Sequence, residues 1–342
     1  MRMRRAWIIG CLVLAVSICG CSKQQQEEPE NTLLYEDEIE DSEDYIVVGF
    51  AQVGSESDWR LANTQSFLDT FKEEHGYYLL FEDGQQKQEN QIKAIRNFIL
   101  QEVDYIILDP IVETGWDAVL QEAKAAGIPV ILSDRLVEVE DESLYTCWVG
   151  SDFEEEGRIA GRWLKDYLED EGRSKEEIRI VTLQGTLDSS AQLGRTKGFS
   201  DILEEQSNWN MLERMSGDFT LTKGREVMEY FLNTYEDIDV VICENDNMAF
   251  GAIEAIKDAG KTCGPDGDMI LISFDAAQAA IEAMQRGELN VDVECNPLLG
   301  PMVEEIIQKL ERGEEVNRIQ YVEEQCFDAL MDLDAIMGTR TY

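Results

Sequence analysis

The feature that most constrains the fold is a repeated alternation of short β-branched runs with longer amphipathic runs. Between residues 46 and 132, apolar runs at 46–50, 77–81, 105–108 and 128–132 are separated by segments with helical spacing. Such alternation predicts a parallel sheet covered by helices on both faces. A second series follows, with strands predicted at 178–183, 240–243 and 269–272. Because very wide sheets are uncommon, we expect an α/β protein of two similar Rossmann-like lobes.

The first twenty residues have the pattern of a secretory signal. Arg2, Arg4 and Arg5 precede an apolar run from Ala6 to Val16. The run is shorter than the roughly 20 apolar residues that a membrane span needs. Small residues then precede Cys21, which resembles the lipobox of bacterial lipoproteins and implies a lipid on Cys21. We therefore expect an extracytoplasmic protein tethered by lipid; the alternative is a secreted protein in which Cys21 merely lies near the cleavage site.

The segment that follows the signal is acidic and poor in apolar residues. Residues 21–44 are rich in Glu, Asp and Gln, so they cannot bury enough surface to fold, and we expect a disordered spacer. The whole chain has a formal net charge of −42. Removal of residues 1–20, with three arginines and no acids, makes it −45. This charge opposes nucleic-acid binding and favours an uncharged or cationic ligand.

The sequence predicts neither a metal centre nor catalysis. Beyond Cys21 there are five cysteines without CxxC spacing, and His75 is the sole histidine, so no zinc cluster is expected. There is no Gly-x-Ser-x-Gly elbow and no Walker loop, and His75 lies at a predicted helix end. We expect no enzyme activity and no cofactor. The sequence does not decide between disulfides and free thiols for the five cysteines, Cys147, Cys243, Cys263, Cys295 and Cys326.

Polar side chains follow several of the predicted strands. They occur at 52–59, at Asp134 and Arg135, at Asn245 and Asp246, and at Asp275. Turns and helix N-caps favour such residues, which is the structural alternative. However, a helix cap requires neither the indole of Trp59 nor the guanidinium of Arg135. Because ligands bind at the carboxyl ends of parallel strands, we expect a binding site there.

Four segments resemble bacterial galactofuranose-binding proteins, of the ribose- and galactose-binding class of solute receptors. They are VGFAQVGSESDWR at 48–60, DGQQKQENQ at 83–91, SDR at 133–135 and GDFT at 217–220. The resemblance implies a type I binding protein whose lobes, 45–148 with 296–323 and 149–295 with 324–342, are joined by a three-strand hinge. It implies a monomer that binds one monosaccharide and delivers it to an ABC permease and its ATPase.

The resemblance also implies which residues contact the sugar. In the first lobe, an indole would stack on the sugar ring while carboxylate and guanidinium groups bind its hydroxyls. The second lobe would add an arginine, an aromatic ring, an amide and a carboxylate. The residues that match the family's ligand contacts are Ser55, Glu56, Trp59, Arg60, Asp134, Arg135, Arg195, Phe219, Asn245 and Asp275.

Two departures from the family pattern leave the particular sugar open. Gly194 stands where an aspartate is more common, and Cys295-Asn296 replaces other residues near the last hinge strand. The same fold also serves receptors that present a sugar or autoinducer to a sensor kinase or chemoreceptor, so this remains the alternative function. A sugar-responsive repressor is excluded, because the chain starts with an export signal rather than a basic helix-turn-helix.

Overall fold

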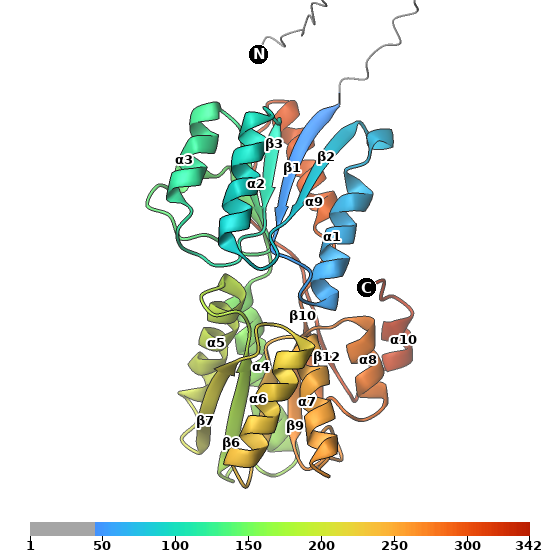
Figure 1. Ribbon diagram of the computed structural model, residues 1–342. Helices are drawn as coiled ribbons and strands as arrows, with labels where there is room; N and C mark the ends of the chain where they lie inside the picture. Colours follow the sequence, from blue (N-terminus) through green and yellow to red (C-terminus); the bar gives the residue numbers. More distant parts are fainter. Residues whose placement is uncertain (1–44) are drawn as a thin grey trace, which may run out of the picture. The chain divides into compact units, whose positions relative to one another are not determined.

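The computed structural model describes residues 45–342, which form two α/β lobes (Figure 1). The predicted signal, the spacer and Cys21 lie outside the described residues. The strands are β1 Ile46–Gln52, β2 Tyr77–Asp83, β3 Tyr105–Leu108, β4 Val130–Ser133, β5 Cys147–Gly150, β6 Ile178–Gln184, β7 Trp209–Ser216, β8 Val240–Cys243, β9 Ile270–Asp275, β10 Val291–Glu294, β11 Ile319–Tyr321 and β12 Cys326–Asp328. The helices are α1 Asp58–Thr70, α2 Gln88–Leu100, α3 Asp117–Ala126, α4 Phe153–Asp170, α5 Ser190–Leu203, α6 Leu221–Thr234, α7 Asp246–Asp258, α8 Gln278–Gln285, α9 Gly300–Glu311 and α10 Leu333–Met337, with short 3-10 turns at Glu73–His75 and Glu142–Leu144.

The two sheets share one strand order. The first runs β11-β5-β4-β3-β1-β2 and is parallel throughout, and the second runs β12-β10-β9-β8-β6-β7. In the second sheet only the β10–β12 pair is antiparallel. This arrangement confirms the prediction of two similar Rossmann-like lobes.

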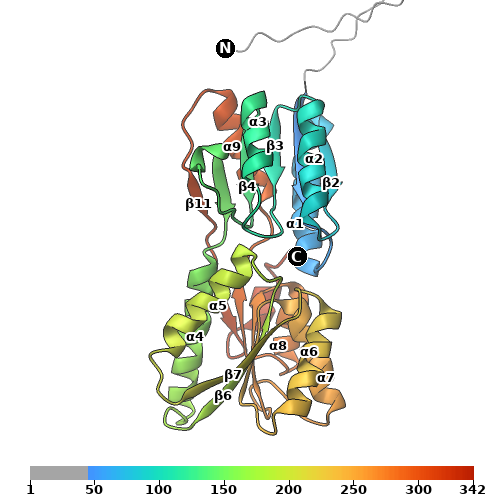
Figure 2. The ribbon, with the colours of Figure 1, turned by 60° about the vertical axis from the view of Figure 1, so that its left-hand side comes forward.

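Each sheet is buried between two layers of helices, which explains why its central strands are apolar on both faces. In the first lobe, α2 and α3 pack on one face, and α1 and α9 on the other. In the second lobe, α4 and α5 cover one face, while α6, α7 and α8 cover the other (Figure 2).

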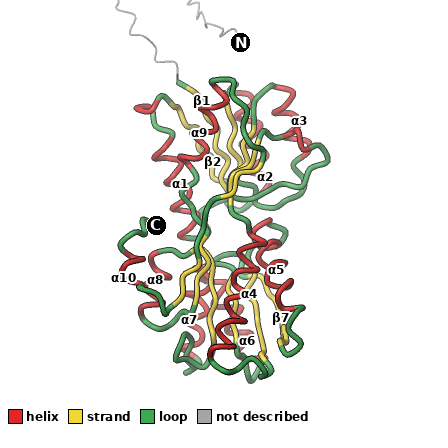
Figure 3. The backbone as a smooth tube through the Cα atoms, turned by 180° about the vertical axis from the view of Figure 1, so that it is seen from behind, coloured by secondary structure: helices red, strands yellow, loops and turns green. Residues whose placement is uncertain are grey.

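The chain passes between the lobes three times. The crossings are residues 151–152, between β5 and α4, 295–299, between β10 and α9, and 322–325, between β11 and β12. Figure 3 shows these segments running side by side between the two sheets. Each lobe is therefore assembled from separate parts of the chain.

The strand order also determines where a ligand would bind relative to the carboxyl ends of the strands. In each sheet the first strand of the series, β1 or β6, lies between the second and the third, so the connections leave in opposite directions. Ligands of open α/β sheets bind at such a switch point. The carboxyl ends of β1, β3, β4, β6, β8 and β9 lead directly into loops that carry polar side chains.

Two further features of the described part of the chain complete the description. Its five cysteines are all free thiols, which settles the alternative between disulfides and thiols that the sequence left open. Among residues 45–342, no helix combines the length and the apolar character needed to cross a membrane.

Candidate functional site

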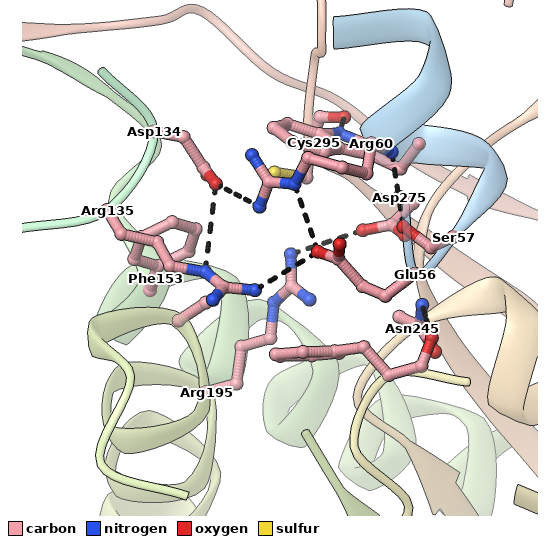
Figure 4. Close-up of a pocket in the computed structure, with 13 residues that line it drawn as sticks. Glu56, Ser57, Arg60, Asp134, Arg135, Phe153, Arg195, Asn245, Asp275 and Cys295 are labelled. Atoms are coloured by element: carbon pink, nitrogen blue, oxygen red, sulfur yellow. Dashed lines mark hydrogen bonds and ion pairs between the residues drawn. The ribbon is translucent and has the colours of Figure 1, made fainter. Parts of the chain in front are cut away.

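A pocket of about 290 Å³ lies between the lobes, at the carboxyl ends of the strands (Figure 4). Residues from both lobes line it, namely Glu56, Ser57, Trp59, Arg60, Asp134, Arg135, Phe153, Ala191, Arg195, Phe219, Asn245, Asp275 and Cys295.

The structure brings nine of the ten predicted ligand-binding residues to this pocket; the exception is Ser55. The side chain of Ser55 is exposed and does not line the pocket. Two residues further on, Ser57 lines it and also caps α1, because its hydroxyl accepts a hydrogen bond from the backbone N–H of Arg60 at 3.1 Å. The position of Ser55 therefore gives no support to the prediction that it contacts a ligand.

Arg60 is the centre of the first lobe's half of the site. Its guanidinium donates to Glu56 Oε1 at 3.0 Å, to Asp109 Oδ2 at 3.0 Å and to Asp134 Oδ2 at 2.7 Å. Burial disfavours the charged form of Arg60, but the three carboxylates outweigh this effect and raise the pKa of Arg60 above its usual value. Arg60 is thus fixed in one orientation and stays charged.

Asp109 was not predicted, although it carries the same signal as the predicted residues, since it directly follows the apolar strand β3. It is fully buried and holds Arg60 from outside the pocket lining. Burial is also the main reason that the pKa of Asp109 rises, to about 8. We therefore regard Asp109 as a positioning residue for Arg60.

Arg135 extends the charged cluster toward the second lobe. Its guanidinium lies 3.7 Å from Glu56 Oε1, donates to the carbonyl of Ile111 at 3.2 Å, and packs 5.2 Å from the ring centre of Phe219. Burial and the neighbouring Arg60 lower the pKa of Arg135.

Among the residues that line this half of the pocket, two buried polar atoms have no hydrogen-bond partner within the chain. They are Glu56 Oε2 and Arg135 Nε. Because buried polar atoms are normally paired, a carboxylate oxygen and a guanidinium N–H on one pocket wall point to a ligand with both donors and acceptors. Although burial opposes it, the guanidinium groups of Arg60 and Arg135 keep the pKa of Glu56 below its usual value, so Glu56 is an acceptor.

Arg195 is the corresponding group of the second lobe. Its Nε donates to Glu156 Oε2 at 2.6 Å, Nη1 donates to the carbonyl of Glu244, and Nη2 contacts Asp275 Oδ1 at 3.4 Å. Burial acts against the charge, but Glu156 and Asp275 raise the pKa of Arg195 well above its usual value. Glu156 was not predicted, because nothing in its local sequence separates it from the surface acids beside it.

Three aromatic rings line the pocket, Trp59 from the first lobe and Phe153 and Phe219 from the second. The indole N–H of Trp59 donates to the carbonyl of Cys295 at 2.7 Å, which fixes the plane of the ring across the lobe boundary. Phe219 lies directly over Gly185, where a Cβ atom would approach the ring to 1.9 Å. Only glycine fits at that position.

Asn245 lines the pocket, but its amide is already engaged within the second lobe. Its Oδ1 caps α7 by accepting from the N–H of Met248 at 2.9 Å, and its Nδ2 donates to the carbonyl of Phe219 at 3.1 Å. Asn245 therefore ties the loop that carries Phe219 to the start of α7.

Three pocket residues have a strained backbone conformation. Asp134, Phe219 and Asp275 have φ values of 59°, 60° and 110°, in the region that favours glycine. Each such residue costs about 1–3 kcal/mol, and strain of this kind is concentrated at functional sites.

The fold and the pocket together define a class: a two-lobed α/β protein that encloses a compact polar ligand between its lobes. Residues 48–297 match the model of the periplasmic binding protein domain family. The chain belongs to this family.

Several relatives are closely similar over most of the chain. The galactofuranose-binding protein YtfQ of Escherichia coli (strain K12) is 44% identical over 260 residues, which are 75% of this chain and 79% of the relative. A Mycobacterium smegmatis structure in complex with β-D-fucofuranose is 42% identical with a TM-score of 0.82, covering 86% of this chain and 94% of that one. The binding protein of the arabinose ABC transporter of Shewanella sp. ANA-3, bound to α- and β-L-arabinofuranose, is 39% identical with a TM-score of 0.80, covering 86% and 95%.

Proposed function

We propose that this protein binds one monosaccharide outside the cytoplasm and delivers it to the permease and ATPase of an ABC importer. Galactofuranose or a similar furanose is the favoured ligand, because relatives at about 40% identity are named for, or were solved with, furanose sugars. The lipid tether at Cys21 is part of this proposal.

The observation that carries the proposal is the character of the pocket. Fixed carboxylates and guanidinium groups of both lobes face a space between the lobes that is also lined by an indole and two phenyl rings. A sugar matches this combination, since its hydroxyls both donate and accept while its C–H face packs on an aromatic ring. Contacts from both lobes make binding and closure a single event.

A sugar panel tests the proposal. We expect galactofuranose, or another sugar among galactose, ribose and arabinose, to stabilise the purified protein by about 2.7 kcal/mol at 100 times its Kd. Glu56→Gln keeps the shape of the side chain but removes its charge. It should raise the Kd by roughly 10- to 100-fold, because a hydrogen bond to a charged group contributes about 1.5–3 kcal/mol. Calorimetry measures the Kd independently of fold stability.

Ser55→Ala is the matched control, since Ser55 is exposed beside the pocket without lining it. Its Kd should equal that of wild type. The proposal is wrong if no sugar of the panel changes the melting temperature, or if S55A weakens binding as much as E56Q does.

A further inference from the structure

The three crossings between the lobes meet in one polar cluster behind the pocket. We call Ser151, Glu156, Cys295 and Glu324 the hinge cluster. Ser151 belongs to the first crossing, Cys295 to the second and Glu324 to the third, while Glu156 is in the first turn of α4. The cluster therefore touches every segment that joins the lobes.

The side chains of the hinge cluster are in direct contact. Ser151 Oγ lies 3.2 Å from Cys295 Sγ and donates to Glu324 Oε1 at 2.5 Å, and the backbone N–H of Asn296 donates to the same oxygen at 2.8 Å. One carboxylate oxygen of Glu156, one of Glu324 and the sulfur of Cys295 all lie within 4.8 Å of one another. Three potential metal ligands thus converge from distant parts of the sequence.

The cluster is largely buried, with Glu324 half-buried, and it is short of positive charge. Glu156 and Cys295 are each 2% exposed. Arg195 occupies Glu156 Oε2, but Glu156 Oε1 is buried without a hydrogen-bond partner. A buried carboxylate without sufficient compensation is unfavourable, so the cluster calls for a proton or another cation.

The donor set indicates which cation would fit. A thiolate with two carboxylates matches the S and O ligands of Zn²⁺, whereas Ca²⁺ and Mg²⁺ prefer oxygen alone. Ligand atoms of a tetrahedral zinc lie about 3.6 Å apart, given metal–ligand distances of roughly 2.0–2.3 Å. Binding would therefore draw the three atoms together by up to about 1 Å.

We propose that the hinge cluster binds one divalent cation of the zinc class, held by the thiolate of Cys295 and the carboxylates of Glu156 and Glu324. Such an ion would tie the second and third crossings to the start of α4. Ser151 also lines a surface groove, together with Asp152 and Glu154. The site adjoins the pocket, since Cys295 also lines the pocket and Glu156 also holds Arg195. The proposal itself does not depend on the proposed function.

Cobalt titration of the chelator-treated protein, without sugar, tests this site. We expect one Co²⁺ per chain, with the near-ultraviolet absorption of a cobalt–thiolate bond, and competition by Zn²⁺. Cys295→Ser should abolish the absorption. Glu324→Gln should weaken Co²⁺ binding by more than about 10-fold, because even indirect contacts to a metal contribute 10- to 100-fold. Affinity should rise with pH, since the ligands must lose protons.

Cys263→Ser is the matched control, because Cys263 is a buried thiol of the second lobe whose partner is the carbonyl of Glu288. This variant should retain the absorption and the affinity. The proposal is overturned if wild type shows no cobalt–thiolate absorption, if C295S retains it, or if E324Q binds Co²⁺ as tightly as wild type. A cluster neutralised by protons alone would give the first of these results. Should C295S fail to fold, E324Q still decides between the outcomes.

Discussion

At the scale of single residues, the second lobe supports its pocket arginine with a buried acid that faces away from the ligand. Glu244 is 1% exposed, and its carboxylate accepts from Thr196 Oγ1 at 2.5 Å and from the N–H of Gly185 at 2.8 Å. Its backbone carbonyl accepts from Arg195. Burial raises the pKa of Glu244 to about 7. The stability of this region therefore depends on the protonation of Glu244 near neutral pH.

This linkage predicts how stability depends on pH. Between about pH 4.5 and 7 the folded protein keeps a proton on Glu244 that the unfolded chain has lost, so this residue's contribution to stability falls as the pH rises. Glu244→Gln stays neutral throughout. Its free energy of unfolding should therefore improve relative to wild type across that window, by up to about 3 kcal/mol. Urea unfolding at several pH values measures the difference; a difference that does not change with pH would contradict the pKa.

Single residues also show how far the site could be predicted. Asp134 and Arg135 could be located because they directly follow a buried strand, and strand ends meet at one edge of a parallel sheet. Ser55 and Ser57 could not be distinguished, because the turn between β1 and α1 decides which hydroxyl points inward. Cys295 was missed because it lies on a crossing between the lobes, and Phe153 because it begins α4 directly after one; the sequence does not show what a crossing faces.

At the scale of elements, the N-termini of α1 and α7 face each other across the lobe boundary. The backbone N–H of Asp58 donates to Asn247 Oδ1 at 3.0 Å, and Asn247 Nδ2 donates to Asp58 Oδ2 at 3.2 Å. Neither residue lines the pocket. This pair of hydrogen bonds links the lobes directly and independently of a ligand.

Breaking this link should weaken sugar binding without touching the sugar. Asn247→Ala removes two hydrogen bonds that together contribute about 1–2 kcal/mol to closure, so the Kd should rise by roughly 5- to 30-fold. Asn247→Asp should be worse, because a second carboxylate then faces Asp58 and one donor is lost. Calorimetry measures the Kd. Asn233→Asp, an equal change of charge on the exposed end of α6, should leave it unchanged; equal effects of N247D and N233D would mean that charge alone is responsible.

The elements themselves were predicted unevenly. The central strands are continuous β-branched runs, because both faces of the sheet are buried. They could therefore be predicted directly from the sequence. β7 was missed, since it is an edge strand whose side chains are mostly half-buried and its composition is mixed. The close approach of α4 and α5 depends on Gly157 and Gly198, where a Cβ atom would lie 2.3 and 1.9 Å from backbone oxygens. Glycines in a sequence do not reveal which helices they allow to meet.

At the scale of the whole molecule, the proposed lipid tether determines where the protein works. Cys21→Ser should release the protein from membranes of the cells that produce it, because the thiol that would carry the lipid is gone. Fractionation, with mass spectrometry of the amino-terminal peptide, measures this. Cys19→Ser is the control, since it removes a thiol two positions away and should stay membrane-bound. If C21S also stays on the membrane, the protein is held there by other means.

The three crossings have a consequence for how the protein is made. β11, at residues 319–321 of 342, is the edge strand of the first sheet, while β12 follows it as the edge strand of the second. Neither sheet can therefore be completed until the chain is available as far as β11 and β12. A protein that crosses a membrane as an extended chain can fold only after its passage. Interleaved lobes delay the final folded state until that passage is nearly over, and they also mean that neither lobe can be separated from the other by a single cut in the chain.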